Sequence, residues 1–83
     1  MPLAKYVKFR EEKFGGVLFE TRSETVFTLT AVAAAVVREL TAGGDQGEII
    51  ARLKQRYHDR GESLERDVST FIAQLRDKGL IQD

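Results

Sequence analysis

Few residues of this chain have the type and spacing that catalysis or metal binding requires. His58 is the only histidine, and without further donors around it we expect a structural residue near a helix end, where partial positive charge is favourable. Glu11 and Glu12 are adjacent on an expected strand, so their carboxylates point to opposite faces and cannot form an acid–base pair. The chain has no cysteine, which excludes disulfides, thiolate metal sites and cysteine nucleophiles.

Other features exclude further classes of function. The glycines at 15–16 lack the Gly-Lys-Ser/Thr ending of a phosphate loop and precede no helix, so they predict a hairpin turn. Thirteen basic residues balance thirteen acidic ones, which gives phosphate backbones little to bind. The apolar run 31–37 is far shorter than the ~20 residues of a membrane span, and the N-terminus lacks a signal peptide's apolar core. We therefore expect a cytoplasmic binding module and not an enzyme.

The elements that position the remaining residues begin with a three-stranded antiparallel meander. Residues 5–12 alternate apolar and charged side chains, the period of a half-buried strand. Residues 17–20 form the second strand, and residues 25–29, rich in β-branched and aromatic side chains, form the third. Because no fourth strand is predicted nearby, the third strand keeps unpaired N–H and C=O groups that another chain could use.

Three helices are predicted after the meander. Thr30 caps the first, over residues 31–40, and the glycines at 43–44 end it. Asp45 and Glu48 have the spacing of a capping box and begin the second helix.

The second helix is expected to end near residues 58–61, and Ser63 to cap the third. The third helix has the strongest amphipathic pattern of the chain, with apolar residues at Leu64, Val68, Phe71, Ile72 and Leu75. Gly79 ends it, and the apolar residues 80–81 are expected to pack back onto the core.

Together these elements predict a single α+β domain over residues 1–83, a winged helix-turn-helix-like fold with a three-stranded antiparallel sheet followed by three helices. This architecture has two uses. A DNA-binding transcriptional regulator, the alternative reading, would place its last helix in the major groove, but residues 63–79 carry as many acidic as basic side chains. The other use adds an extended peptide to the free edge of the third strand, beside the third helix.

The sequence resembles the PqqD-like proteins, stand-alone recognition elements for ribosomally synthesised, post-translationally modified peptides. The resemblance covers about residues 5–81 and is carried by "VKFREEKFGGVLFE", by "VFTLT" running into an alanine-rich helix, and by "LERDVSTFIAQLRDKGLI". It implies a protein that binds the leader segment of a precursor peptide and delivers it to a modifying enzyme, often a radical S-adenosylmethionine (radical SAM) enzyme. It also implies no catalytic residue and no cofactor.

The chain departs from some members of the family in one respect, which narrows the group of members that it resembles. The chain lacks the tryptophans and the proline-glycine turn of some members dedicated to pyrroloquinoline quinone. We therefore expect a member of the broader PqqD-like group and not of that pathway.

Carried onto this chain, the resemblance implies a peptide site on the third strand and on one flank of the third helix. The expected residues are Thr25, Val26, Phe27, Thr28, Leu29, Asp67, Thr70, Phe71, Gln74 and Lys78. At about 100° per residue the helix has two shoulders, and we choose the one with Asp67 because the family's groove has an acidic residue before an apolar pair. The opposite shoulder holds Glu65, Ser69 and Arg76. The sequence leaves open which shoulder faces the strand. It also leaves open that Phe71 is an ordinary core residue and that Gln74 and Lys78 are solvated surface residues.

Overall fold

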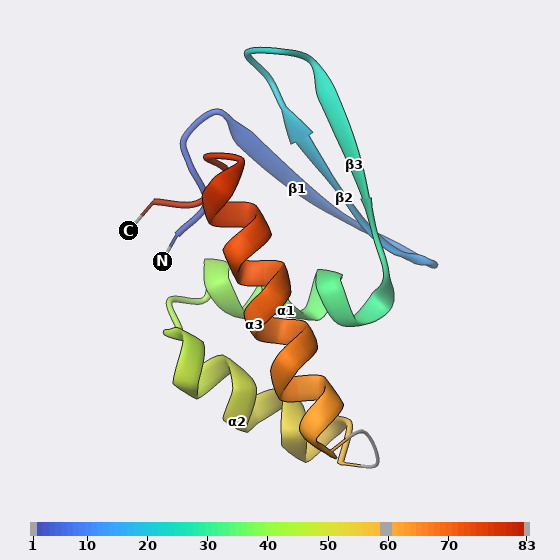
Figure 1. Ribbon diagram of the computed structural model, residues 1–83. Helices are drawn as coiled ribbons and strands as arrows, with labels where there is room; N and C mark the ends of the chain where they lie inside the picture. Colours follow the sequence, from blue (N-terminus) through green and yellow to red (C-terminus); the bar gives the residue numbers. More distant parts are fainter. Residues whose placement is uncertain (1, 59–60, 83) are drawn as a thin grey trace.

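The computed structural model describes residues 2–58 and 61–82. The elements follow in the order β1 (Val7–Glu12), β2 (Gly15–Glu20), β3 (Thr25–Leu29), α1 (Ala31–Thr41), α2 (Gln46–Arg56) and α3 (Gly61–Asp77). The strands form an antiparallel sheet in the order β1-β2-β3. Figure 1 shows the helices gathered on one side of the sheet, with the C-terminal end of α3 beside the strands. The predicted three-stranded sheet followed by three helices is confirmed.

Two strand boundaries differ from the prediction. β1 begins two residues later, because the Val7 N–H bonds to the Ala4 carbonyl oxygen at 3.0 Å and closes a turn there. β2 begins two residues earlier, so the expected turn glycines belong to the strand. Gly15 has a φ of +148°, and a Cβ there would lie 2.3 Å from the Leu29 carbonyl oxygen. Glycine is therefore needed where β2 passes the end of β3.

Side-chain caps set the starts of the first two helices. The Thr30 hydroxyl accepts a hydrogen bond from the Ala33 N–H at 3.2 Å. Asp45 accepts from the Glu48 N–H, and the Glu48 carboxylate accepts from the Asp45 N–H, which completes a capping box. Both predicted caps are confirmed.

The predicted cap of the third helix is wrong. α3 already begins at Gly61, so Ser63 lies inside its first turn. The earlier start places the carboxylate of Glu62 in that turn, where the helix dipole favours negative charge. α2 ends earlier than predicted, because Tyr57 leaves the helical conformation (φ −118°, ψ 48°). Residues 59–60, within the predicted end of the second helix, lie outside the described residues.

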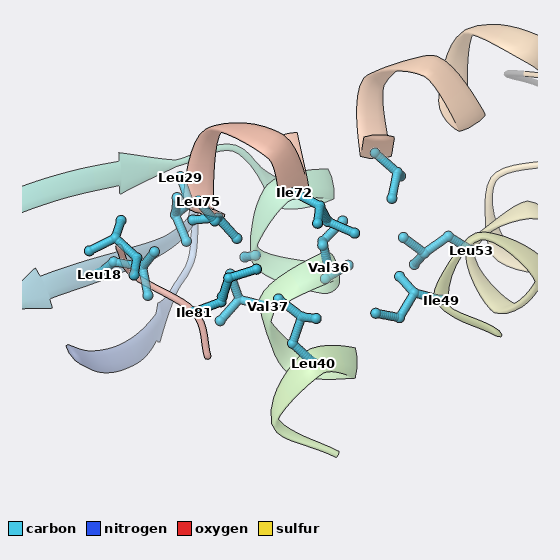
Figure 2. Close-up of a cluster of buried hydrophobic side chains, with 14 of the residues drawn as sticks. Leu18, Leu29, Val36, Val37, Leu40, Ile49, Leu53, Ile72, Leu75 and Ile81 are labelled. Atoms are coloured by element: carbon cyan, nitrogen blue, oxygen red, sulfur yellow. The ribbon is translucent and has the colours of Figure 1, made fainter. Parts of the chain in front are cut away.

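The core lies between the helices and the inner face of the sheet. Fully buried side chains come from β2 and all three helices, and include Leu18, Val36, Val37, Leu40, Ile49, Leu53, Leu64, Val68 and Ile72. Figure 2 shows most of these side chains pointing toward one another between the elements. Ala34 and Ala35 are also buried, and their small side chains let α1 approach β2, on which it packs. In contrast to the rest of its stripe, Phe71 is only half-buried.

The C-terminal tail closes the domain. Gly79 ends α3 with a φ of +71°, and the N–H groups of Gly79 and Leu80 bond back to the carbonyl oxygens of Arg76 and Leu75, a Schellman motif. Leu80 and Ile81 are buried, as predicted. Ile81 also pairs with Leu3 in an antiparallel bridge that the sequence did not predict. The two ends of the described chain are thus held together.

Candidate functional site

β3 has one paired and one open edge. Within the described residues β2 alone pairs with it. The Thr21 N–H donates to the Tyr6 carbonyl oxygen at 2.9 Å, which extends the β1–β2 ladder by one residue pair. Because antiparallel pairs alternate between hydrogen-bonded and non-bonded, the backbone groups of Glu20, Leu18 and Gly16 then face β3.

The β2–β3 register determines which backbone groups of β3 face the open edge. Glu20, Leu18 and Gly16 pair with Thr25, Phe27 and Leu29 of β3. The backbone N–H and C=O groups of Val26 and Thr28 therefore point away from the sheet, toward any chain that lies alongside β3.

A groove runs beside this edge, between β3 and α3. Its larger hollow, of about 620 Å³, is lined by the end of β3, the first turns of α1 and one flank of α3: Thr28, Leu29, Thr30, Ala31, Val32, Ala33, Val36, Asp67, Val68, Phe71 and Gln74. A smaller hollow, of about 160 Å³, is lined by Leu18, Phe27, Thr28, Leu29, Phe71, Gln74, Leu75, Lys78 and Leu80. Four residues are common to both hollows, so they form one continuous β3–α3 groove.

The groove has an apolar floor and a charged group in each hollow. Phe71 lines both hollows, and its half-buried ring leaves apolar surface for a ligand. Asp67 lines the larger hollow and Lys78 the smaller one. The Lys78 ammonium lies 5.7 Å from the centre of the Phe27 ring, a cation–π distance. A ligand in this groove would meet opposite charges at its two ends.

Most of the predicted site residues lie on this groove. Seven of the ten line it, namely Phe27, Thr28, Leu29, Asp67, Phe71, Gln74 and Lys78. Thr25, Val26 and Thr70 are exposed and line neither hollow.

The two shoulders of α3 have different neighbours. On the opposite shoulder, Glu65 forms an ion pair with Lys54 at 2.9 Å, and Ser69 accepts a hydrogen bond from Gln46 at 3.1 Å. Both partners belong to α2. The shoulder with Asp67 is the one that borders β3.

Sequence reasoning missed the contribution of α1 to the groove. Val32 and Val36 line the larger hollow, although their helical spacing indicated ordinary core positions. Val36 is fully buried, whereas Val32 is half-buried. An apolar stripe does not distinguish a residue under a neighbouring helix from one at the mouth of a groove, so the sequence held no signal for this role.

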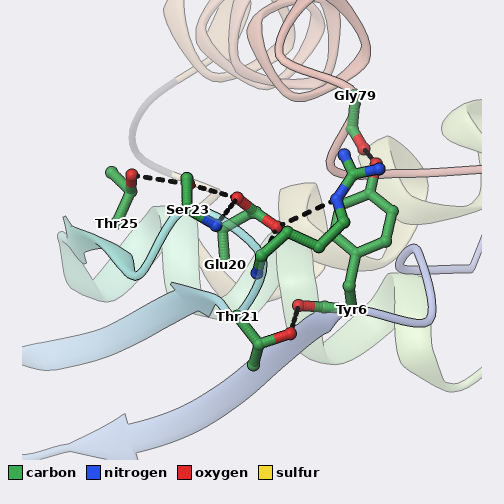
Figure 3. A network of polar contacts seen from close by, with 7 residues as sticks. Tyr6, Glu20, Thr21, Ser23, Thr25 and Gly79 are labelled. Carbon is green, nitrogen blue, oxygen red and sulfur yellow. Dashed lines mark hydrogen bonds and ion pairs between the residues drawn. The ribbon is translucent and has the colours of Figure 1, made fainter.

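A polar network ties the β2–β3 turn to the end of α3 (Figure 3). The Tyr6 hydroxyl donates to the Gly79 carbonyl oxygen at 2.6 Å, and the Arg22 guanidinium lies 3.5 Å from the centre of the Tyr6 ring. Glu20 accepts hydrogen bonds from the N–H groups of Arg22 and Ser23, each at 2.9 Å, and from the Ser23 hydroxyl. This network fixes the position of the turn before β3 relative to α3, at the Lys78 end of the groove.

The same network controls the ionisation of Glu20. The hydrogen bond from the Ser23 hydroxyl is the main cause that lowers the pKa of Glu20 to about 2. Burial of the carboxylate opposes this shift, and the backbone N–H groups of Arg22 and Ser23 add to it. The folded turn therefore favours the ionised carboxylate.

We expect Glu20→Gln to lower the thermal unfolding midpoint, and the deficit to shrink in acid. The carboxylate is easier to ionise in the folded state, so its stabilising effect is complete above its ordinary pKa of 4.5 and is lost as the pH falls through about 2. Thermal unfolding of both proteins across this range measures the deficit. Glu24→Gln is the control for the loss of one carboxylate, because Glu24 lies in the same turn but is exposed, and we expect it to leave the unfolding midpoint near the wild-type value. A Glu20→Gln deficit of equal size at every pH would contradict the assignment.

Glu11, Glu12 and His58 lie where the sequence analysis predicts them. Glu11 forms an ion pair with Arg38 of α1 at 2.6 Å, whereas Glu12 pairs with Arg10 on the other face of the sheet at 2.5 Å. His58 is exposed just after α2. Among residues 2–58 and 61–82, no cluster of three or more His, Cys, Asp or Glu side chains has the geometry of a metal site. In that same part of the chain, no helix has the length and apolar character needed to cross a membrane.

The model of the family described as coenzyme PQQ synthesis protein D (PqqD) matches residues 15–81. The chain belongs to the PqqD family. The match confirms the resemblance seen in the sequence, and it spans every residue of the β3–α3 groove of this PqqD-family protein. A comparison with curated proteins found no match.

Two solved structures are similar to this PqqD-family protein. One is described as TbiB1 in complex with the TbiA(beta) leader peptide; it is 26% identical, has a TM-score of 0.86, and the match covers 99% of this chain and 95% of that one. The other is described as lasso peptide synthetase B1 complexed with the leader peptide. It is 23% identical, has a TM-score of 0.82, and the match covers 98% of this chain and 95% of that one. Both share the fold described above.

Proposed function

We propose that this PqqD-family protein captures the leader segment of a ribosomally made precursor peptide and presents it to a modifying enzyme. The observation that carries the proposal is the open edge of β3 beside the apolar β3–α3 groove. The two similar structures support it, since both are described as complexes with a leader peptide.

In this proposal the leader adds to the sheet as a fourth strand. The outward N–H and C=O groups of Val26 and Thr28 bond to the main chain of the leader and set its register. Leader side chains that point toward the helices enter the groove over Phe71. Asp67 and Lys78 act on the charges of the leader, and such rim charges chiefly affect association rate and choice of partner.

The protein supplies recognition, and the chemistry comes from its partner. We propose a partner of the radical SAM type, the class implied by the family resemblance, and a cytoplasmic setting for the pair. A non-catalytic role needs no reacting group at the site, and the groove is lined mainly by apolar side chains. The bound leader would tether the rest of the precursor near the enzyme, which raises its effective concentration there.

The DNA-binding alternative has less support. Both shoulders of α3 have neighbours within the protein, α2 on one side and the groove on the other. The charged side chains of α3 and its C-terminal cap are Glu62, Glu65, Asp67 and Asp77 against Arg66, Arg76 and Lys78. A helix of this charge has no excess of cations for the phosphate backbone.

A titration followed by amide chemical shifts tests the proposal. The probe is a peptide of about ten residues, longer than a typical strand, selected for binding to this chain from a displayed random library. We expect the largest shifts in β3, at Phe71 and at the neighbouring groove residues of α3. The comparison ligand is a DNA duplex of mixed sequence at physiological salt, which we expect to bind weakly. Shifts confined to α2 or β1, or tight and sequence-selective DNA binding, would contradict the proposal.

A further inference from the structure

The face of the sheet that points away from the helices is unusually apolar next to the open edge. A sheet with one face toward solvent normally carries polar side chains there. Here the outward positions include Val17 and Phe19 of β2 and Val26 of β3, which line a shallow hollow with Lys8, Phe9 and Arg10 of β1. Val26 is 58% exposed, one of the most exposed large apolar residues of the described chain. Phe19 lies directly opposite Val26 in the register and covers it from one side only.

Val26 combines two properties that bear on a strand added at the edge. Its side chain points to the outer face of the sheet, and its backbone N–H and C=O point to the open edge. A strand that bonds to Val26 therefore places one residue directly opposite it on the same outer face. The row that begins with Lys8, Phe19 and Val26 would then continue onto the added strand.

The next residue of the added strand has the opposite orientation. It lies across from Phe27, whose side chain faces the helices and lines the groove. The residue after that returns to the outer face beside Thr28, which carries a hydroxyl. The apolar contact on the outer face is thus limited to the position opposite Val26.

We propose that the leader is recognised on both faces of the sheet, through two adjacent apolar residues. A β-branched or aromatic residue packs on Val26 at the outer face, and its neighbour fills the groove beside Phe27 and Phe71. This inference rests on the proposed function, because it requires the leader to bind as a fourth strand. Recognition on both faces predicts a leader segment with two adjacent apolar residues. A strand recognised on one face would instead alternate apolar and polar residues.

The test compares two identical substitutions on the outer face. Val26→Thr keeps the β-branch and the backbone N–H but replaces an apolar methyl group with a hydroxyl. Val17→Thr makes the same change on β2, one strand away from the edge, and is the matched control. The probe is a fluorescein-labelled peptide of about ten residues, longer than a typical strand, selected on the wild-type chain from a displayed random library. We expect Val26→Thr to weaken its binding about threefold to fivefold, the upper range for a cross-strand pair, and Val17→Thr to leave it unchanged.

A second selection gives an independent result. Peptides selected on the wild-type chain should share two adjacent apolar positions, and peptides selected on Val26→Thr should keep only one of them. Equal binding to the wild-type and Val26→Thr chains, or a polar residue at the position beside Val26, would overturn the inference. Val26→Pro separates this outcome from failure of the proposed function. If Val26→Pro abolishes binding while Val26→Thr does not, the leader adds to β3 but is not recognised on the outer face; if both bind normally, strand addition itself is wrong.

Discussion

Proline at Val26 or Thr28 is expected to weaken leader binding sharply in a protein that still folds, whereas proline at Phe27 is expected to unfold the sheet. The two outcomes differ because the backbone groups of β3 alternate in direction. Val26 and Thr28 point their N–H groups to the open edge, so proline there removes a donor that the β2–β3 ladder does not use and that bonds to the leader under the proposed function. We expect at least about a tenfold loss of affinity for each, from one lost hydrogen bond and the steric bulk of the ring.

Phe27 differs because its N–H belongs to the β2–β3 ladder. Its partner is Leu18, which is fully buried, so proline leaves a carbonyl group in the sheet without its donor. An unsatisfied buried acceptor costs about 1–3 kcal/mol, and the partly buried aromatic ring is lost as well. For a domain of this size that is a large part of the total stability.

Circular dichroism melts and leader titrations on the three variants measure both effects. Thermal midpoints should remain near the wild-type value for the Val26 and Thr28 variants and fall sharply for Phe27→Pro. If both edge variants bind the leader normally, the open edge of β3 is not the binding site. If instead Val26→Pro unfolds the protein and Phe27→Pro does not, the assigned direction of the backbone groups is reversed.

Alanine at Phe71 and at Ile72 is expected to separate binding from folding at two adjacent positions of α3. Ile72 is fully buried, so Ile72→Ala should lower the free energy of unfolding by about 2–5 kcal/mol through lost burial and the cavity left behind. Phe71 is half-buried and lines both hollows of the groove. Phe71→Ala should therefore cost less stability but weaken leader binding by about 2 kcal/mol, the scale of a central aromatic contact.

The control is the same aromatic truncation at a surface far from the groove. Phe14 is 56% exposed in the β1–β2 turn and lines neither hollow, so Phe14→Ala should bind the leader as the wild type does. Denaturant unfolding gives the stabilities, and titrations at a temperature where all variants are folded give the affinities. Normal leader binding by Phe71→Ala would show that the groove floor is not part of the peptide site.

Local sequence signals predicted most of the elements. The caps at Thr30 and Asp45 and the stop at Gly79 were predicted correctly, because each depends on hydrogen bonds between residues within five positions of one another. The cap predicted at Ser63 was wrong because the sequence pattern there is less specific. A serine followed by an apolar stripe is compatible with a cap but does not require one, and the helix begins three residues earlier than a Ser63 cap predicts.

The candidate site was only partly accessible from the sequence. That the third strand lies at an edge followed from the number and order of the strands. Helical spacing then gave α3 two equivalent shoulders, and nothing in the spacing distinguishes them. The choice depends on where α2 packs, since Lys54 and Gln46 meet the shoulder of Glu65 and Ser69 and leave the other shoulder beside β3.

The sequence by itself determined which segments become strands and helices, the absence of cysteine chemistry, and the presence of an unpaired strand edge, because these follow from composition and from periods of a few residues. Only the tertiary structure decided which backbone groups of β3 point outward, which flank of α3 forms the groove, and how the two chain ends meet. The bond from Thr21 to Tyr6 sets the direction of the backbone groups, and the bridge between Leu3 and Ile81 joins residues almost the whole chain apart. Contacts of that separation depend on how the elements pack together, and no local pattern of residues encodes them.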